Sequence, residues 1–365
     1  MIKKIEVLTD DLHVYFNNER HEIYPNIWLR DHAKDDENWD KRSNQRKTFT
    51  ANLDFNLKIK NVEIIENGKH IKVLWPDLQK PVKYSYEFLS NNSLNNESKT
   101  NNLKLWKKNE LSDQIFIDFE TIQSDEGFKK FLKLLYQYGF SVVKNCKKEI
   151  SSVENIAKKI GYVRNSIFGG LWSFESNEDR ADSSYTQEEL RPHTDATYSN
   201  DAPGLQLLLC CEYKAKGGDS IMVDGFKIAE VIKRENKELF ELLSTINVKG
   251  HYIGDGVFLE AERPIFNLNS KNELFQVSFN NYDRAPFRME KDLTIKFYEA
   301  IKRFDLIANS RDYQWRHILK PGELLIFNNW RILHGRGSFD GTRKISGCYI
   351  NKEDFDSSCR MNDIF

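Results

Sequence analysis

The amino-acid sequence predicts a mainly β protein with flanking helices, built from a small β domain and a larger jelly-roll-like domain. Short apolar runs bounded by turn residues recur along most of its 365 residues. They do not alternate regularly with helical segments, as the strands of a parallel α/β sheet would. Many short strands of this kind favour a barrel or jelly-roll core with helices packed outside it.

A polar segment rich in Asn and Ser, residues 90–103, interrupts this series and has no periodic apolar face. Such a composition is typical of a linker or a long surface loop. We therefore predict a small amino-terminal β domain over residues 1–95, a linker over residues 96–111, and the larger domain over residues 112–365.

Short strands are expected in the amino-terminal domain. Its apolar runs cover residues 5–7, 23–29, 57–65 and 70–75. The pair Asn67-Gly68 separates the last two runs and predicts a hairpin turn, because both residue types tolerate positive φ.

Beyond the linker, helical patterns come first and strands then dominate. Residues 127–138 carry apolar and aromatic side chains at helical spacing, and residues 153–160 predict a second helix. Longer helical inserts are predicted near residues 224–244 and 291–308. Strands are predicted over residues 115–117, 140–143, 205–211, 220–223, 248–253, 275–279, 314–319, 323–327 and 344–350.

Bulk composition excludes several classes of protein. The formal net charge is −1, which gives no electrostatic footprint for nucleic acid or an acidic membrane. No apolar run approaches the roughly 20 residues that a membrane helix needs. The first residues lack the long apolar segment of a signal peptide and the Arg- and Ser-rich character of a transit peptide. We therefore expect a cytoplasmic protein.

The cysteines predict ordinary reduced thiols. Their number is odd and none shows C-x-x-C spacing, so neither a disulfide framework nor a cysteine-rich zinc site is indicated. The five are Cys146, Cys210, Cys211, Cys348 and Cys359.

The sharpest chemical signal is His193-Thr194-Asp195 followed much later by His334. In an extended segment, residues i and i+2 point to the same face, so His193 and Asp195 can grip one ion together. Two imidazoles and one carboxylate are the ligand set of non-heme Fe(II) oxygenases. From spacing alone, hydrogen-bonded core or surface histidines remain an alternative.

Arg343 strengthens the metal interpretation. An Fe(II) oxygenase commonly needs a co-substrate that supplies two electrons, and an α-keto diacid would chelate the metal at one end. Its other carboxylate needs a cation, for which Arg offers a planar fork that Lys lacks. Arg343 lies nine residues after His334, at the start of a predicted strand.

Ordered motifs give these residues a family context. The sequence resembles the 2-oxoglutarate dioxygenases of the taurine dioxygenase superfamily, and within them the branch of γ-butyrobetaine and trimethyllysine dioxygenases. The likeness spans nearly the whole chain. It rests on WLRDH (28–32), WPD (75–77), HTDATY (193–198), PGLQLL (203–208), GGDSIMVDGF (217–226), FNNYDRA (279–285), PGELLIFNNWRILHGRGSF (321–339) and GTRKISGCY (341–349).

The resemblance implies a double-stranded β-helix, or jelly-roll, catalytic domain with Fe(II) on His193, Asp195 and His334. It also implies 2-oxoglutarate on Arg343, with the hydroxyl of Ser220 near the co-substrate carboxylate. Ascorbate as reductant and a homodimer are further expectations of this kind. Relatives often bind structural zinc through cysteines after the WLRDH-like motif, but no cysteine precedes Cys146 here. We therefore predict no zinc.

Substrate preference is also suggested by the resemblance. This branch holds a trimethylammonium group in an aromatic cage, because ring faces attract a cation that has no N–H donor. The cage would consist of Phe168, Trp172, Tyr185 and Tyr349, although core aromatics are the simpler alternative.

The other end of the substrate would meet Asp182 and Asn280. An acid at Asp182 suits the α-ammonium of N6-trimethyllysine, hydroxylated at C3, and Asn280 would contact the carboxylate. Asp182 could instead pair with an Arg such as Arg343. γ-Butyrobetaine or a trimethylammonium phosphonate remains an alternative substrate. A jelly-roll binding protein without catalytic activity is the alternative from another functional class.

Overall fold

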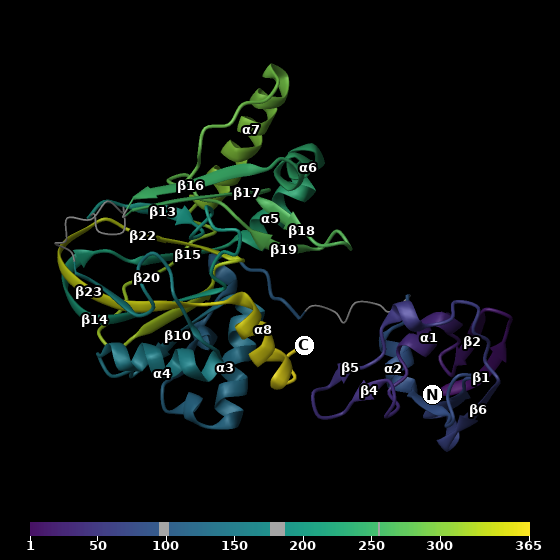
Figure 1. The fold of residues 1–365 in the computed structure, drawn as a ribbon. Helices are drawn as coiled ribbons and strands as arrows, with labels where there is room; N and C mark the ends of the chain where they lie inside the picture. The colour runs from purple at the N-terminus through teal and green to yellow at the C-terminus, as the bar shows by residue number, and fades with distance from the viewer. Residues whose placement is uncertain (95–101, 176–186, 255) are drawn as a thin grey trace. The chain divides into compact units, whose positions relative to one another are not determined.

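The chain forms two compact units, Met1–Thr100 and Asn101–Phe365 (Figure 1). The computed structural model describes residues 1–94, 102–175, 187–254 and 256–365. The boundary between the units falls within the predicted linker, residues 96–111. The predicted linker extends too far toward the carboxyl terminus, because it includes a residue of the second unit's core. Trp106 is 1% exposed and its indole N–H donates to the carbonyl of Tyr138 at 2.8 Å. A core tryptophan therefore anchors this segment in the second unit.

The amino-terminal unit is mainly β, as predicted. Its sheets have the orders β1-β2-β3 and β6-β7-β8, with a small β4-β5 pair. The strands are β1 (Ile2–Val7), β2 (Asp11–Phe16), β3 (His21–Pro25), β4 (Trp39–Asp40), β5 (Gln45–Arg46), β6 (Asn61–Ile65), β7 (His70–Leu74) and β8 (Val82–Ser85), and the helices are α1 (Asn26–Asp31) and α2 (Tyr86–Asn91). The hairpin at Asn67-Gly68 is confirmed: β6 pairs with β7, and these two residues have φ of 54° and 82°.

Two of the quoted motifs meet inside this unit. Arg30 of WLRDH donates to Asp77 of WPD, with 2.7 Å between Nη2 and Oδ2. The hydroxyl of Tyr84 donates to the carbonyl of Leu29 at 2.7 Å and accepts from the indole N–H of Trp75 at 3.2 Å. Packing and polar contacts therefore connect these motifs.

In its described part, the second unit contains two main sheets, which gives the predicted jelly-roll architecture. One has the order β11-β23-β14-β21-β10-β9, with β12 added to β23, and the other has the order β13-β22-β15-β20. Strands of the first sheet are β9 (Phe116–Asp118), β10 (Phe140–Lys144), β11 (Val163–Arg164), β12 (Trp172–Glu175), β14 (Leu205–Gly217), β21 (Leu324–Asn328) and β23 (Phe339–Ile350). Those of the second are β13 (Leu190–His193), β15 (Ser220–Asp224), β20 (Trp315–His317) and β22 (Ile332–Arg336). The hairpins β16 (Val248–Gly254)–β17 (Val257–Arg263) and β18 (Phe266–Leu268)–β19 (Leu274–Val277) form two separate two-stranded sheets.

Helices cover the outer faces of both sheets. Helices α3 (Asp125–Tyr138), α4 (Ile150–Ile160) and α8 (Lys352–Met361) lie beside the first sheet (Figure 1). They share one apolar core with it. Helices α5 (Gly225–Glu235), α6 (Lys237–Thr245) and α7 (Lys291–Ala308) share another core with the second sheet. Short 3-10 turns occur at Thr50–Asn52, Glu66–Gly68, Lys108–Glu110, Asp113–Ile115 and Thr121–Gln123. No helix among the described residues is long and apolar enough to cross a membrane.

The structure corrects some element predictions. The helix predicted near residues 224–244 is two helices, because Asn236 is extended and its side chain caps α6 by accepting from the Leu239 N–H at 3.2 Å. Several elements were not expected: helices α1, α2 and α8, and strands β2, β4, β5, β8, β11, β12, β13, β17, β18 and β22. β13 reads LRPH and β22 reads ILHGR, too short and too mixed to show strand periodicity. These two unpredicted strands carry the predicted histidines.

Candidate active site

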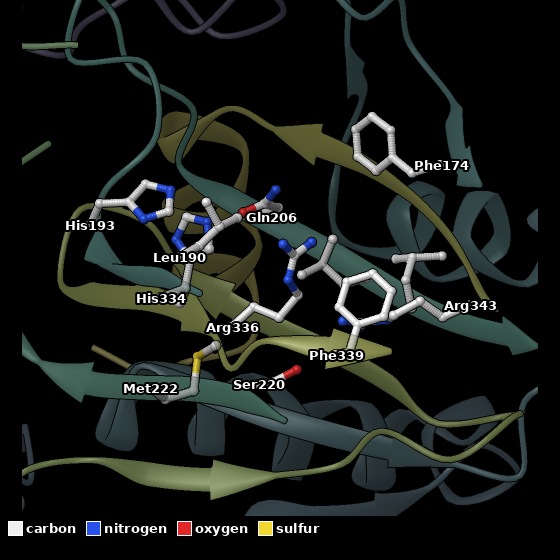
Figure 2. A pocket seen from close by; sticks show the side chains of 13 residues that line it. Phe174, Leu190, His193, Gln206, Ser220, Met222, His334, Arg336, Phe339 and Arg343 are labelled. Carbon is white, nitrogen blue, oxygen red and sulfur yellow. The ribbon is translucent and has the colours of Figure 1, made fainter. Parts of the chain in front are cut away.

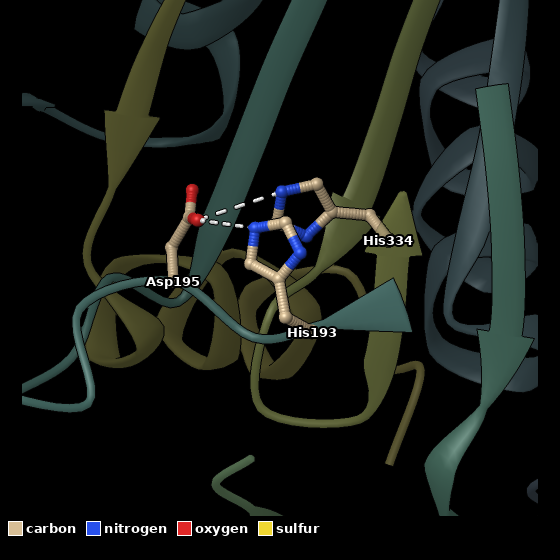
Figure 3. A group of neighbouring side chains, drawn as sticks. All are labelled: His193, Asp195 and His334. Atoms are coloured by element: carbon tan, nitrogen blue, oxygen red, sulfur yellow. Dashed lines mark ion pairs between the residues drawn. The ribbon is translucent and has the colours of Figure 1, made fainter. Parts of the chain in front are cut away.

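The structure brings His193, Asp195 and His334 together (Figure 3). His193 ends β13 and lies directly opposite His334 on β22. One ligand atom from each residue falls within 4.8 Å of the others. The Nε2 atoms of both histidines lie 3.5 Å from Oδ1 of Asp195. Two imidazoles and a carboxylate thus face one point, which fits a divalent ion such as Fe(II) with coordination positions left open.

Hydrogen bonds orient two of these ligands. Nδ1 of His193 lies 2.8 Å from the carbonyl of Arg191, and a carbonyl can only accept, so Nδ1 donates. This tautomer leaves the lone pair of Nε2 for a metal. The hydroxyl of Tyr349 donates to Oδ2 of Asp195 at 2.8 Å, which leaves Oδ1 facing the two imidazoles.

Asn329 holds the backbone of Asp195, a role that the sequence did not reveal. The Asp195 N–H donates to Oδ1 of Asn329 at 2.8 Å, and Nδ2 of Asn329 donates to the Asp195 carbonyl at 3.1 Å. Ala196 follows with a φ of 57°, an uncommon conformation for a residue with a Cβ. The chain therefore turns sharply just after the carboxylate ligand and is tied in place there.

Burial and mutual charge shape the protonation of the three ligands. Burial lowers the pKa of His334 to about 4, which favours the neutral imidazole that a metal requires. Burial would also lower the pKa of His193, but the hydrogen bond and charge of Asp195 raise it. Burial would raise the pKa of Asp195, whereas the two imidazoles hold it well below its usual value. The carboxylate is therefore ionised and attracts positive charge.

A cavity of about 120 Å³ opens beside the triad, between the two sheets (Figure 2). Arg343 and Ser220, both predicted for the co-substrate, line it together with His193 and His334. Arg336, which the sequence analysis missed, lines it too. It follows His334 by two residues on one strand, so the same-face rule that linked His193 to Asp195 could have found it.

The two arginines make this cavity strongly cationic. Their guanidinium carbons lie 5.3 Å (Arg343) and 4.8 Å (Arg336) from the centre of the Phe339 ring. Burial lowers the pKa of Arg343, and burial together with the charge of Arg343 lowers that of Arg336 to about 10. Nη1 of Arg343 donates to the Gly218 carbonyl at 3.2 Å, but its buried Nε has no partner among the described residues. A carboxylate such as that of 2-oxoglutarate fits this unsatisfied donor.

A second cavity, of about 100 Å³, adjoins the first at the triad and also contacts Asp195. The two cavities share Phe174, Leu190, His193, Gln206 and His334. Of the predicted substrate residues, Phe168, Asn280 and Tyr349 line it. Trp172 does not: it is 6% exposed and packs its ring 5.9 Å from that of Tyr349. Asp182 and Tyr185 lie outside the described residues. Tyr198, Tyr282 and Asp283 line the cavity and were not predicted.

Known proteins are similar in sequence to this chain over nearly its whole length. Residues 107–349 match the model of the "Taurine catabolism dioxygenase TauD, TfdA family", and residues 4–90 match "Gamma-butyrobetaine hydroxylase-like, N-terminal". Human mitochondrial trimethyllysine dioxygenase is 32% identical over 346 residues, which cover 92% of this chain and 82% of the relative. The chain belongs to the TauD, TfdA dioxygenase family.

Further comparisons agree with this membership. Human gamma-butyrobetaine dioxygenase is 28% identical over 362 residues, covering 94% of this chain and 92% of the relative. The structure of an asparagine oxygenase in complex with Fe(II), 3-hydroxyasparagine and succinate superposes with a TM-score of 0.50 at 14% identity, over 62% of this chain and 80% of that one. The superposition agrees with the family's fold. Membership of this dioxygenase family, together with the triad and the cavity of Arg343, makes the chain an Fe(II)- and 2-oxoglutarate-dependent enzyme with a small-molecule substrate.

Proposed function

We propose that this dioxygenase hydroxylates N6-trimethyllysine at C3. Its curated relatives include trimethyllysine dioxygenases from vertebrates and fungi at about 30–32% identity over more than nine-tenths of this chain. The observation that carries the proposal is the position of the triad at the junction of two cavities. One cavity is cationic and suits an anionic co-substrate; the other is lined by aromatic rings and suits a quaternary ammonium.

Each group of side chains has a separate task in this proposal. His193, Asp195 and His334 hold Fe(II), and Arg343 with Ser220 holds the distal carboxylate of 2-oxoglutarate. When bound, these cofactors use O₂ to replace one substrate C–H hydrogen by hydroxyl, with succinate and CO₂ as co-products. Phe168 and Tyr349, together with the predicted cage member Tyr185, orient the trimethylammonium group, and Trp172 packs against the ring of Tyr349. The apolar walls supplied by Phe174, Leu190, Leu208 and Ile345 exclude water from the cationic cavity.

γ-Butyrobetaine is the second candidate substrate, because a γ-butyrobetaine dioxygenase is also a relative over nearly the full chain. A trimethylammonium phosphonate is a third candidate.

The test measures succinate release and product mass when the Fe(II)-loaded enzyme is given each compound together with 2-oxoglutarate. We expect trimethyllysine to give the highest kcat/KM and a product one oxygen heavier. A higher value for either other compound would reassign the substrate, and activity that survives in His193→Ala/Asp195→Ala would refute the metal assignment.

We also propose a reductant, an oligomeric state, the absence of zinc and a cellular location for this enzyme. Ascorbate would serve as reductant, the enzyme would work as a homodimer, the amino-terminal unit would bind no zinc, and the location would be cytoplasmic. Several vertebrate relatives carry the word mitochondrial in their names, so cell fractionation is the measurement that decides the last of these.

A further inference from the structure

A second carboxylate besides the metal ligand Asp195 lines the substrate cavity. Asp283 lies in the loop after β19 and faces the same cavity as His193, His334 and Tyr349. It is partly buried. The proposed metal chemistry does not use it, so its place in this cavity requires another explanation.

The loop that carries Asp283 is bound to the segment around the triad at several points. The N–H of Thr194 donates to the Phe279 carbonyl at 2.7 Å, and the Phe279 N–H donates to the Thr194 hydroxyl at 2.9 Å. The Asp283 carbonyl accepts from the His251 N–H on β16 at 2.8 Å. The loop therefore has a defined position relative to the metal ligands.

Side-chain contacts also fix the Asp283 carboxylate itself. Its Oδ2 accepts from Nδ2 of Asn280 at 2.8 Å and from the hydroxyl of Thr197 at 3.3 Å. Oδ1 of Asn280 accepts from the Tyr282 N–H at 2.8 Å, so this amide is engaged on both sides. Asn280, predicted to contact the substrate carboxylate, is thus in the structure a residue that positions Asp283.

The chemistry of the candidate substrates tells which group would meet a carboxylate here. A quaternary ammonium has no N–H, so it cannot donate a hydrogen bond to Asp283. An α-ammonium carries three donors and forms charge-assisted hydrogen bonds with a carboxylate. A substrate that ends in a carboxylate alone would be repelled by Asp283.

We propose that Asp283 is a specificity-determining residue that receives the α-ammonium of an amino-acid substrate. This inference rests on the proposed function and deepens it: the aromatic side of the cavity holds the trimethylammonium end, and Asp283 selects substrates that also carry a free α-ammonium. Asp182, predicted for the same group, lies outside the described residues, so its contribution is measured in parallel.

The experiment compares wild type with Asp283→Asn, which keeps the side-chain shape and removes the charge. The probes are trimethyllysine and 6-(trimethylammonio)hexanoate, which differ only by the α-ammonium. We expect kcat/KM for trimethyllysine to fall about 10- to 100-fold, mainly through KM, because a hydrogen bond to a charged group is lost. For the hexanoate we expect no loss of kcat/KM and a modest gain, because Asp283→Asn removes the charge that repels its carboxylate. Asp283→Glu should recover part of the loss.

Matched variants and a binding measurement complete the design. Asp305→Asn makes the same charge change on α7, outside the substrate cavity. This variant should leave kcat/KM for both compounds unchanged. Anaerobic calorimetry with 2-oxoglutarate present measures binding of both compounds without turnover. Asp182→Asn is measured in the same way.

The outcomes separate this inference from the proposed function. Equal losses on both probes would make Asp283 a structural residue and overturn the inference while trimethyllysine hydroxylation stands. If the wild type binds trimethyllysine no more tightly than the hexanoate, the inference is also wrong. Preferential binding of trimethyllysine that Asp283→Asn abolishes, without hydroxylation of it, would support the inference and refute the proposed function.

Discussion

Single residues in this enzyme show how an unsatisfied buried charge marks a binding site. Arg343 lies in a cavity with a second arginine, and its Nε has no partner among the described residues. Such an arrangement is costly in the free protein, because burial lowers the pKa of Arg343, and burial together with the charge of Arg343 lowers that of Arg336. A dicarboxylate co-substrate would relieve that cost on binding.

This argument gives a prediction for Arg343→Lys. Lysine keeps the charge but lacks the planar fork that binds a carboxylate through two parallel hydrogen bonds. We expect KM for 2-oxoglutarate to rise on the order of tenfold or more, with little change in thermal stability. Succinate release at varied 2-oxoglutarate concentration measures it. Arg303→Lys, at an exposed ion pair with Glu235, is the control; an equal effect there would refute the assigned role.

At the scale of elements, one buried ion pair joins the strands that carry the site. Asp224 ends β15 and caps α5 by accepting from the Phe226 N–H at 3.1 Å. It also pairs with Arg331, just before β22, at 2.7 Å. Arg331 donates in turn to the carbonyls of Lys104 and Gln137 at 2.7 and 2.9 Å. The pair therefore connects the strands of Ser220 and His334 to the end of α3.

Removal of one partner should be strongly destabilising. Asp224→Ala would leave the Arg331 charge buried and unpaired, which typically costs about 3–5 kcal/mol. Asp201→Ala breaks the pair with Arg164 at the surface, where Asp201 is 65% exposed, and should cost less than about 1 kcal/mol. Urea unfolding of both variants measures the difference. Similar losses would show that burial does not govern the Asp224 pair.

On the scale of the whole molecule, all the cysteines lie in one of the two units, so their reactivity can measure the unfolding of that unit. All five are free and buried, and all belong to the unit Asn101–Phe365. Burial raises the pKa of Cys146, Cys348 and Cys359 to about 12. At neutral pH these thiols are therefore protonated and protected, so labelling of them follows the unfolding of the catalytic unit.

The same shifts predict alkaline destabilisation. In the unfolded chain these thiols ionise near their ordinary pKa of 9, whereas in the folded unit they stay protonated to about pH 12. Their contribution to stability is thus complete below pH 9 and is lost as the pH rises from about 9 to 12. Urea midpoints followed by thiol labelling at several pH values test this. In Cys146→Ala the urea midpoint should fall less steeply with rising pH than in the wild type. A wild-type midpoint that stays constant above pH 9 would contradict the prediction.

The sequence by itself predicted the mainly β architecture and the residues of the metal triad, together with Arg343 and Ser220. These signals are local: turn pairs, apolar runs, an i, i+2 spacing, and motifs in a fixed order. Shifts in element boundaries, such as the two helices separated at Asn236, came from capping interactions that periodicity does not reveal.

Only the tertiary structure could assign Asn329 and Asp283 to the site and show that Trp172 packs against Tyr349 without lining the substrate cavity. Asn329 matters because a distant turn brings it to the backbone of Asp195, and Asp283 because Asn280 and Thr197 hold it in the substrate cavity. Strand pairing sets which side chains share a cavity, and pairing joins segments more than a hundred residues apart. The chemistry of oxidation is therefore readable along the chain, whereas the selection of substrate depends on side chains that meet only after folding.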